Sequence, residues 1–145
     1  MKILRLRGFT LIELLVVIGI LAVLLAITLV AINPQKQFQQ ANNTQRQSDV
    51  NAILNGINQY AVDQKGQLPA GITAVPQMIA STGGVDLCTI LVPEYLAAMP
   101  SDPVNGTFTS CADYNTGYQV ATSGNNRISV IAPGAEQGAS ISATR

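Results

Sequence analysis

The chain has 145 residues, enough for one modest domain, and its eight basic and eight acidic side chains cancel to a formal charge of zero. It has no histidine and two cysteines, too few for a structural zinc site, and no basic surface that predicts constitutive nucleic-acid binding. Without histidine, a general base would have to be a carboxylate or a lysine, and the carboxylates show no paired spacing. We therefore expect neither an enzyme nor a bound cofactor.

The first element of the chain is an apolar run of 24 residues, from Phe9 to Ile32. As a helix, this run would be about 36 Å long, which is enough to cross a bilayer. Three cations precede it, at Lys2, Arg5 and Arg7, and they predict a cytoplasmic N-terminus with the remainder of the chain exported. The run contains one carboxylate near its start, Glu13, and a charge placed there is costly in lipid unless it has a function.

This order of features, with a short basic leader, Gly8, the sequence Phe9-Thr-Leu-Ile-Glu13 and a long apolar helix, resembles the N-terminus of type IV pilins and the related pseudopilins. The resemblance implies that a membrane peptidase cleaves after Gly8, that the new amine of Phe9 is methylated, and that Glu13 guides assembly. It covers about the first 32 residues, and the remainder fits the family in general layout. A secretory signal peptide has a shorter apolar core, and a plain membrane anchor gives Glu13 no role.

Beyond the apolar run, the composition becomes glutamine-rich, and Pro34 predicts a kink because it has no N–H to donate. Apolar residues then recur at spacings of three and four from Val50 to Ala61, which predicts an amphipathic continuation of one long helix to Gln64. Gly66 is the expected stop. Four regions are therefore expected: a leader at 1–8, the membrane and filament-core half of the helix at 9–32, its amphipathic half at 33–65, and a globular head at 66–145.

Within the head, closely spaced glycines and prolines predict mostly loop between residues 66 and 117. Short helices are expected near 75–81 and near 93–99, the second because Pro93 suits a first helical turn. The last dozen residues are rich in Gly, Ala and Ser, and we expect them to be loose.

Alternation of apolar and polar residues at Tyr118–Val120 and at Ile128–Val130 predicts two strands, and residues 123–126 supply a hairpin turn between them. A third strand is expected at 107–109. The expected fold class is therefore α+β: a long N-terminal helix, transmembrane and then amphipathic, packed on a small loop-rich head with a short antiparallel sheet.

Cys88 and Cys111 lie in the part of the chain that is expected to be exported. Exported proteins meet oxidising conditions, so these cysteines are predicted to form one disulfide, worth roughly 3 kcal/mol by loop closure. The alternative is two free buried thiols. A head loop bounded by a disulfide also occurs in many type IV pilins, usually nearer the C-terminus, which leaves open whether this loop is the surface-variable region of the family.

The segment from Met99 to Pro103 resembles a calcium-binding loop of the major pseudopilins of type II secretion, with Asp102 as the matching carboxylate. Only Asp102 and the flanking prolines match, and calcium takes six to eight oxygen ligands. We favour the alternative, a turn in which Asp102 bonds its own backbone, and predict no metal site.

The resemblance predicts a structural subunit of a type IV pilus-like filament. Its implied partners are identical or related subunits, the prepilin peptidase, a membrane assembly platform, and the lipid bilayer before assembly. The precursor would span the inner (cytoplasmic) membrane once, and the product would lie in an extracellular or periplasmic filament. The alternatives are a pseudopilin of a type II secretion or DNA-uptake system, and an anchored binding domain that does not polymerise.

Overall fold

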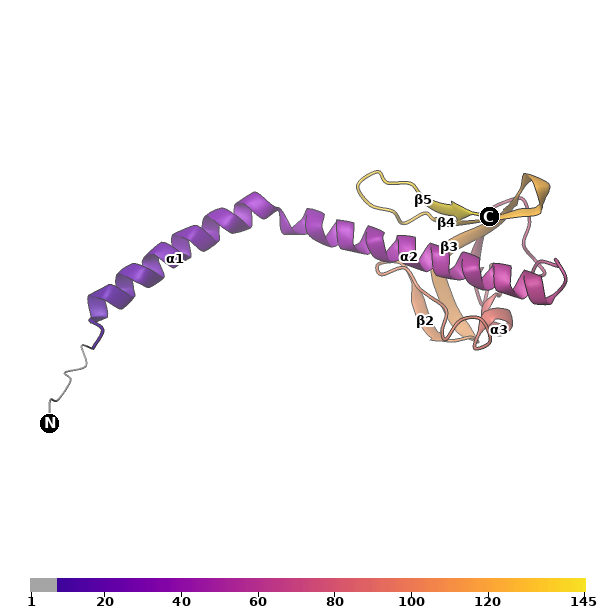
Figure 1. Cartoon of the computed structure of the whole chain (residues 1–145), viewed down its shortest axis with the longest axis horizontal. Helices are drawn as coiled ribbons and strands as arrows, with labels where there is room; N and C mark the ends of the chain where they lie inside the picture. The colour runs from indigo at the N-terminus through magenta and orange to yellow at the C-terminus, as the bar shows by residue number, and fades with distance from the viewer. Residues whose placement is uncertain (1–7) are drawn as a thin grey trace, which may run out of the picture. The chain divides into compact units, whose positions relative to one another are not determined.

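The computed structural model describes residues 8–145. In chain order, its elements are α1 (Leu11–Ile32), α2 (Pro34–Asp63), β1 (Gln77–Ala80), α3 (Cys88–Leu91), β2 (Thr107–Ser110), β3 (Asp113–Ser123), the 3₁₀ turn η1 (Gly124–Asn126), β4 (Arg127–Ala132) and β5 (Ile141–Thr144) (Figure 1). The expected leader, except for Gly8, lies outside the described residues. Packing divides the chain into two compact units between Phe38 and Gln39.

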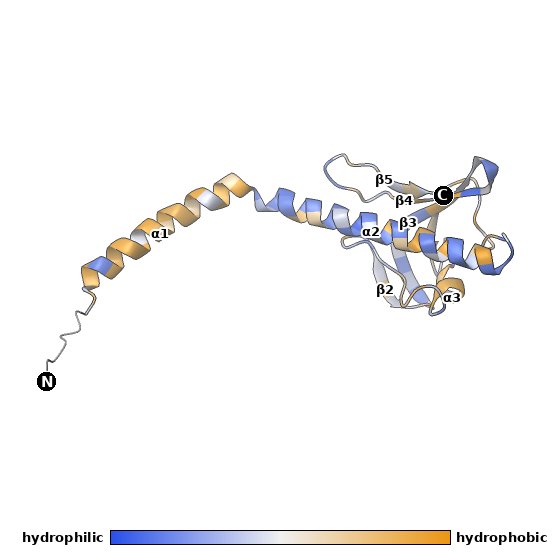
Figure 2. Cartoon of the chain, viewed as in Figure 1, coloured by the Kyte–Doolittle hydropathy of each residue, from blue (hydrophilic) through white to orange (hydrophobic). Residues whose placement is uncertain are grey.

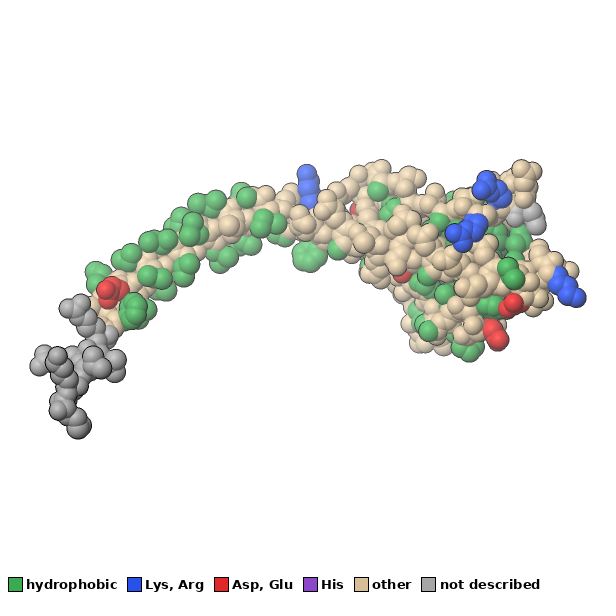
Figure 3. Space-filling view, in the orientation of Figure 1, with side chains coloured by type: hydrophobic (Ala, Val, Ile, Leu, Met, Phe, Trp, Pro, Cys, Tyr) green, Lys and Arg blue, Asp and Glu red, His purple; other side chains and the backbone are tan. Residues whose placement is uncertain are grey.

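The first unit contains α1, a helix of 22 residues that is apolar around its whole circumference (Figure 2). None of its residues is buried by the rest of the chain. By length and composition it is able to cross a membrane, although a signal sequence near an N-terminus meets the same criterion. The space-filling view shows hydrophobic side chains along the helix surface (Figure 3). The apolar surface is therefore available to lipid or to other helices.

The predicted single helix is interrupted at Asn33, whose φ of 46° is left-handed. Pro34 causes this break, because its ring disfavours the helical conformation in the preceding residue and its nitrogen has no proton to donate. Asn33 then begins the next helix, since its side-chain oxygen accepts a 3.4 Å hydrogen bond from the Lys36 N–H. Pro34 takes the first position of α2, where a proline costs no hydrogen bond.

The second unit is built on an antiparallel sheet in the order β1-β3-β4-β5, with β2 also paired to β3. The central hairpin of β3 and β4 was predicted, and its register places Val120 opposite Val130. The predicted third strand is β2. The structure is thus α+β, with a long N-terminal apolar helix, a second helix and a small antiparallel sheet.

The core of this unit forms where one face of α2 meets the sheet. The helix contributes the predicted stripe of fully or almost fully buried residues, namely Val50, Ile53, Leu54 and Ile57. From the hairpin, Tyr118, Val120, Ile128 and Val130 are buried against them. Alternation along the strands places these side chains on one face of the sheet, so that helix and sheet share one core.

The C-terminal end of α2 closes as a Schellman motif. The N–H of Gly66 donates to the carbonyl of Ala61 at 2.7 Å, and that of Lys65 donates to Val62 at 3.2 Å. Lys65 itself takes the left-handed position with φ of 56°, and Gly66 follows with φ of 92°. The helix therefore ends at Asp63, one residue before the predicted Gln64.

Three predictions for the head were wrong. Residues 77–80 form strand β1 rather than a helix, because pairing with β3 buries Ile79 and Ala80. The short helix expected at 93–99 lies instead at Cys88–Leu91, where Leu87 and Leu91 are buried.

The third wrong prediction concerns the C-terminal residues. Residues 141–144 form strand β5 on the edge of β4, and Ile141 is buried in the core. The pairing continues at Arg145, whose N–H and carbonyl exchange hydrogen bonds with Ile128 at 2.9 and 2.8 Å. Pairing with β4 thus orders a segment whose composition alone predicts no structure.

Candidate functional site

The predicted assembly residues lie at the beginning of α1. Thr10 is the N-cap, with extended backbone angles, and its hydroxyl accepts a 3.3 Å hydrogen bond from the Glu13 N–H. In return, Oε2 of Glu13 accepts hydrogen bonds from the Thr10 N–H at 2.8 Å and from the Thr10 hydroxyl at 2.7 Å. This reciprocal arrangement is a capping box, which satisfies N–H groups that have no partner within the helix.

Gly8 and Phe9 precede this cap in non-helical conformation, and the Phe9 side chain is 80% exposed. The peptide bond between them therefore lies outside the helix. In the uncleaved chain, the Phe9 nitrogen is an amide and carries no charge. A positive charge at this position would require cleavage after Gly8.

The prediction from the sequence missed Thr10. The signal that identifies it is the spacing Thr-x-x-Glu directly before an apolar run, which is the sequence signature of a capping box. Glu13 consequently has a local structural role besides any role in assembly, and an experiment on Glu13 has to separate the two.

In the head, Cys88 and Cys111 form the predicted disulfide. It joins the first residue of α3 to the turn between β2 and β3. The Tyr114 hydroxyl supports the same region, because it accepts hydrogen bonds from the N–H groups of Leu87 and Cys88 at 3.0 and 3.2 Å and donates to Asp86 at 2.8 Å. Burial, together with the neighbouring Asp86 carboxylate, raises the pKa of Tyr114 to about 12.

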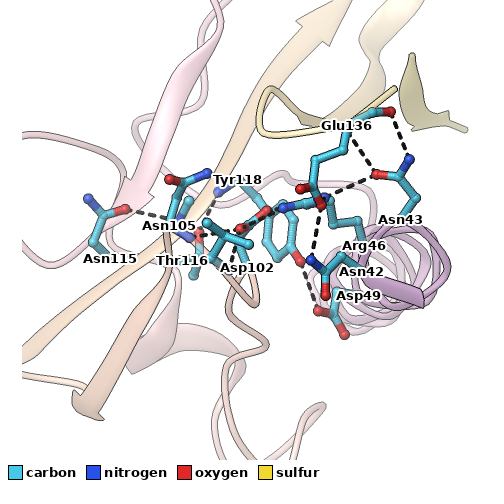
Figure 4. Close-up of polar contacts among 12 residues, drawn as sticks. Asn42, Asn43, Arg46, Asp49, Asp102, Asn105, Asn115, Thr116, Tyr118 and Glu136 are labelled. Carbon is cyan, nitrogen blue, oxygen red and sulfur yellow. Dashed lines mark hydrogen bonds and ion pairs between the residues drawn. The ribbon is translucent and has the colours of Figure 1, made fainter. Parts of the chain in front are cut away.

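A buried ion pair connects α2 to the segment that contains Asp102. Arg46 has no exposed surface and Asp102 is 2% exposed. The Arg46 guanidinium donates from Nε to Oδ2 of Asp102 at 2.6 Å and from Nη2 to Oδ1 at 3.2 Å (Figure 4). This bidentate geometry requires the planar guanidinium of arginine, because the ammonium group of lysine cannot present two parallel N–H donors.

A second carboxylate, Glu136 in the β4–β5 loop, meets the same guanidinium. Nη1 of Arg46 donates to Oε2 of Glu136 at 2.8 Å and to Oδ1 of Asn43 at 3.0 Å. Asn43 also exchanges hydrogen bonds with the backbone of Glu136, both at 2.9 Å, and Asn42 donates to the Glu136 carboxylate at 3.0 Å. About one turn of α2, from Asn42 to Arg46, therefore holds this loop through side-chain contacts.

The charges in this cluster shift the pKa of each ionisable member. Hydrogen bonds from Arg46 and Asn42 lower the pKa of Glu136. Burial by itself would raise the pKa of Asp102, but hydrogen bonds from Arg46 and from the backbone outweigh it, so the pKa lies below its ordinary value. Bonding to Asp102 in turn raises the pKa of Arg46. All three groups are therefore charged at neutral pH.

Asp102 also forms the turn that the sequence predicted. Its Oδ1 accepts hydrogen bonds from the N–H groups of Val104 and Asn105, both at 2.9 Å. Its own N–H donates to the Thr116 carbonyl in β3 at 2.7 Å. Gly117, with φ of 75°, gives the turn room, since a Cβ there would lie 2.8 Å from Cβ of Asp102.

This environment does not fit the calcium site that the resemblance raised. Calcium is bound by oxygen atoms, whereas both oxygens of Asp102 accept hydrogen bonds from N–H groups. Among the residues that the structure describes, no group of three acidic, histidine or cysteine side chains is placed to hold a metal ion.

The pairing of Arg46 with Asp102 was not predicted from the sequence. The available signal was the position of Arg46 on the apolar stripe of α2, four residues before Val50 and seven before Ile53. A cation on a buried helix face requires a buried anion as its partner. The sequence does not show which of the acidic residues in the head supplies it.

Comparison with known proteins bears on the N-terminal site alone. Residues 5–29 match the family model described as the prokaryotic N-terminal methylation motif, and the matched range includes Gly8, Phe9 and Glu13. No curated protein and no solved structure matched the chain. At its N-terminus, the chain carries the prepilin motif of the type IV pilins and pseudopilins.

Proposed function

We propose that the chain is the precursor of a structural subunit of a type IV pilus-like filament. The match to the methylation motif supports a pilin-like or pseudopilin precursor, and type IV pilins are structural, non-enzymatic subunits. The observation that carries the proposal furthest is the placement of this motif on α1. That helix is apolar on all sides, has no buried residue and has one carboxylate in its first turn.

Processing is the first step. The prepilin peptidase would hydrolyse the Gly8–Phe9 peptide bond, and the released α-amine of Phe9 would then be methylated. Methylation keeps the amine basic, so the mature N-terminus remains a cation. The non-helical backbone of Gly8 and Phe9 and the exposure of Phe9 are compatible with a peptidase that must reach this bond.

Assembly is the second step. Before it, α1 would lie in the inner membrane with its N-terminus in the cytoplasm, in contact with an assembly platform. In the filament, the apolar surfaces of neighbouring subunits would replace lipid around α1. Glu13 would then pair with the Phe9 ammonium of an adjacent subunit, and this would fix the axial register because a buried charge without a partner is strongly unfavourable.

Two features of the head favour a pilus over a pseudopilus. The Cys88–Cys111 disulfide is a feature that the resemblance associates with pilins. A calcium-binding loop at 99–103 would favour a pseudopilin, but Asp102, the carboxylate of that loop, is paired with Arg46 instead. A surface filament is therefore the form of assembly that we propose.

Intact-mass measurement and peptide mapping of protein from native membranes and sheared filaments test this proposal. We expect the N-terminal peptide to begin at methylated Phe9 in both fractions. Gly8→Val should block cleavage, since a β-branched side chain would not fit the glycine subsite, whereas Gly8→Ala is the matched conservative control. Assembled protein that still carries its Met1 leader would contradict the proposal. Cleaved protein that never enters a filament would support an anchored binding domain instead.

A further inference from the structure

Three oxygen-bearing side chains converge on the guanidinium of Arg46. Asp102 contributes both carboxylate oxygens, Glu136 contributes Oε2 and Asn43 contributes its amide oxygen, at distances between 2.6 and 3.2 Å. We refer to Asp102, Glu136 and Asn43 as the oxygen cluster. Its members come from three separate segments: the loop before β2, the β4–β5 loop and helix α2 (Figure 4).

Carboxylate and amide oxygens are the ligands that a hard divalent cation prefers. In this chain a side chain supplies the positive charge instead. We propose that Arg46 is the built-in cation of the oxygen cluster, so that the head holds these three segments together without a divalent metal and excludes one from this position. The inference concerns residues 39–145 and does not depend on whether the chain assembles.

The geometry explains why a guanidinium fits here. Its Nε and Nη2 atoms match both oxygens of Asp102, and Nη1 meets Glu136 and Asn43 on the other side. The fork therefore cross-links the segments in the way a bound metal ion would.

Backbone packs directly against the carboxylate of this cluster. A Cβ atom on Gly134 would lie 3.1 Å from Oδ2 of Asp102 and 2.8 Å from Nδ2 of Asn105. With the guanidinium in place, this backbone leaves little room beside the carboxylate for a metal ion that retains waters. The resident arginine and the glycine beside it thus disfavour a hydrated ion.

The test is thermal unfolding of the full-length protein in detergent, followed by circular dichroism, with EDTA, with calcium and with magnesium. For the wild type, we expect the same unfolding midpoint under all three conditions. Arg46→Ala should lower the midpoint by about 10 °C or more, because it leaves two carboxylates without their cation. Calcium at about 10 mM should raise the midpoint of this variant, since weak sites with few charged ligands bind calcium in the millimolar range.

Arg127→Ala is the matched control, because Arg127 is exposed and its loss should leave both the midpoint and the calcium response unchanged. The double variant Arg46→Ala/Asp102→Asn should lose the calcium response of the single variant. Arg46→Lys keeps a positive charge in the oxygen cluster but removes the planar guanidinium. We therefore expect a smaller decrease of the unfolding midpoint and no calcium response.

The inference is overturned if EDTA lowers the midpoint of the wild type, or if radioactive calcium binds to the wild type at one ion per chain. It is also overturned if calcium leaves the Arg46→Ala midpoint unchanged. Should Arg46→Ala not fold, the wild-type measurements with EDTA and radioactive calcium still decide the central claim.

Discussion

The hydroxyl of Tyr118 donates a 2.8 Å hydrogen bond to Oδ2 of Asp49, three residues along α2 from Arg46. Asp49 and Asp102 thus lie at the same helix–sheet junction in opposite electrostatic environments. Burial raises the pKa of Asp49, whose hydrogen-bonding partners, Tyr118 and Gln45, are both neutral. In contrast, the guanidinium of Arg46 helps to hold the pKa of Asp102 below its ordinary value. The two aspartates should therefore respond differently to the same substitution.

The first prediction compares Asp49→Asn with Asp102→Asn. An asparagine at position 49 can still accept the hydrogen bond from Tyr118 and carries no buried charge, so stability at pH 7 should change by about 1 kcal/mol or less. At position 102 the same change removes the buried carboxylate that pairs with Arg46 and leaves the guanidinium only Glu136, which is partly exposed, as an anionic partner. A loss of about 3 kcal/mol is therefore expected. Urea unfolding in detergent measures both. Equal losses of stability in the two variants would mean that the ion pair between Asp102 and Arg46 adds no stability beyond the turn that Asp102 forms.

The second prediction concerns acid pH. The folded-state pKa of Asp102 is lowered, so its stabilising contribution is fully present above the ordinary value near 4 and is lost as the pH falls through the folded pKa. The stability difference between the wild type and Asp102→Asn should therefore shrink below about pH 4. Ionisation of Asp49 has the opposite effect on folding stability. Because the folded-state pKa of Asp49 is raised, its ionisation costs stability as the pH rises above 4. Asp49→Asn should accordingly flatten this part of the profile, which urea titrations at several pH values would show.

The third prediction concerns the disulfide. Cys88→Ser, or reduction of the wild type, should lower the free energy of unfolding by about 3 kcal/mol, since the bridge closes a loop with a sequence separation of 23 residues. Tyr114 still holds the backbone of Leu87 and Cys88, so we expect the head to remain folded at 25 °C. Alkylation mass spectrometry without reductant checks the bridge itself. Full alkylation of both cysteines in native material would contradict it.

The fourth prediction concerns the helix–sheet core. Ile53→Ala removes a side chain with no exposed surface and should cost 2 to 5 kcal/mol, as is usual for large-to-small changes in a packed interior. Val62→Ala, on the same helix, is the control, because Val62 is 78% exposed and its truncation should have an effect of about 0.5 kcal/mol or less. Equilibrium unfolding compares the two. A similar cost for both would argue against the observed packing of α2.

Long periodic signals made the two helices predictable. An uninterrupted apolar run defines α1, and recurrence at three and four residues defines the buried face of α2. The strands β1 and β5 have four residues each, too few for a reliable period, and they form because β3 and β4 offer partners. Short strands of this kind depend on contacts distant in sequence.

The candidate sites, too, were predictable only where the signal can be read from the sequence without knowledge of the tertiary structure. Glu13 was identifiable because it is the one carboxylate in an apolar run, and the disulfide was predictable because the chain has only two cysteines to pair. The partner of Arg46 was not, since Asp102 is 56 residues away and only the tertiary fold brings the two together. The capping role of Thr10 was readable from local spacing and was missed.

The last prediction addresses Glu13, for which the structure shows a capping role and for which we propose a second role in setting the register between subunits. Glu13→Leu removes both the capping box with Thr10 and the negative charge, and Glu13→Gln keeps an oxygen for the capping box while removing the charge. If pairing with a Phe9 ammonium sets the register, both variants should be cleaved normally, accumulate in the membrane and give few filaments. Immunoblots of sheared filaments and of membranes measure the ratio of assembled to membrane-bound subunit.

The matched controls for Glu13 use the two threonines of the same region. Thr10→Val removes the capping hydroxyl and leaves the charge of Glu13, so filaments should still form if charge pairing is the essential interaction. Thr28→Val lies in the same helix, where the hydroxyl bonds only the Leu25 carbonyl, and should assemble like the wild type. Failure of Glu13→Leu and Thr10→Val together with normal assembly of Glu13→Gln would assign the function to capping. Normal filament yield from Glu13→Leu would rule out the register hypothesis, because the charge would then be dispensable.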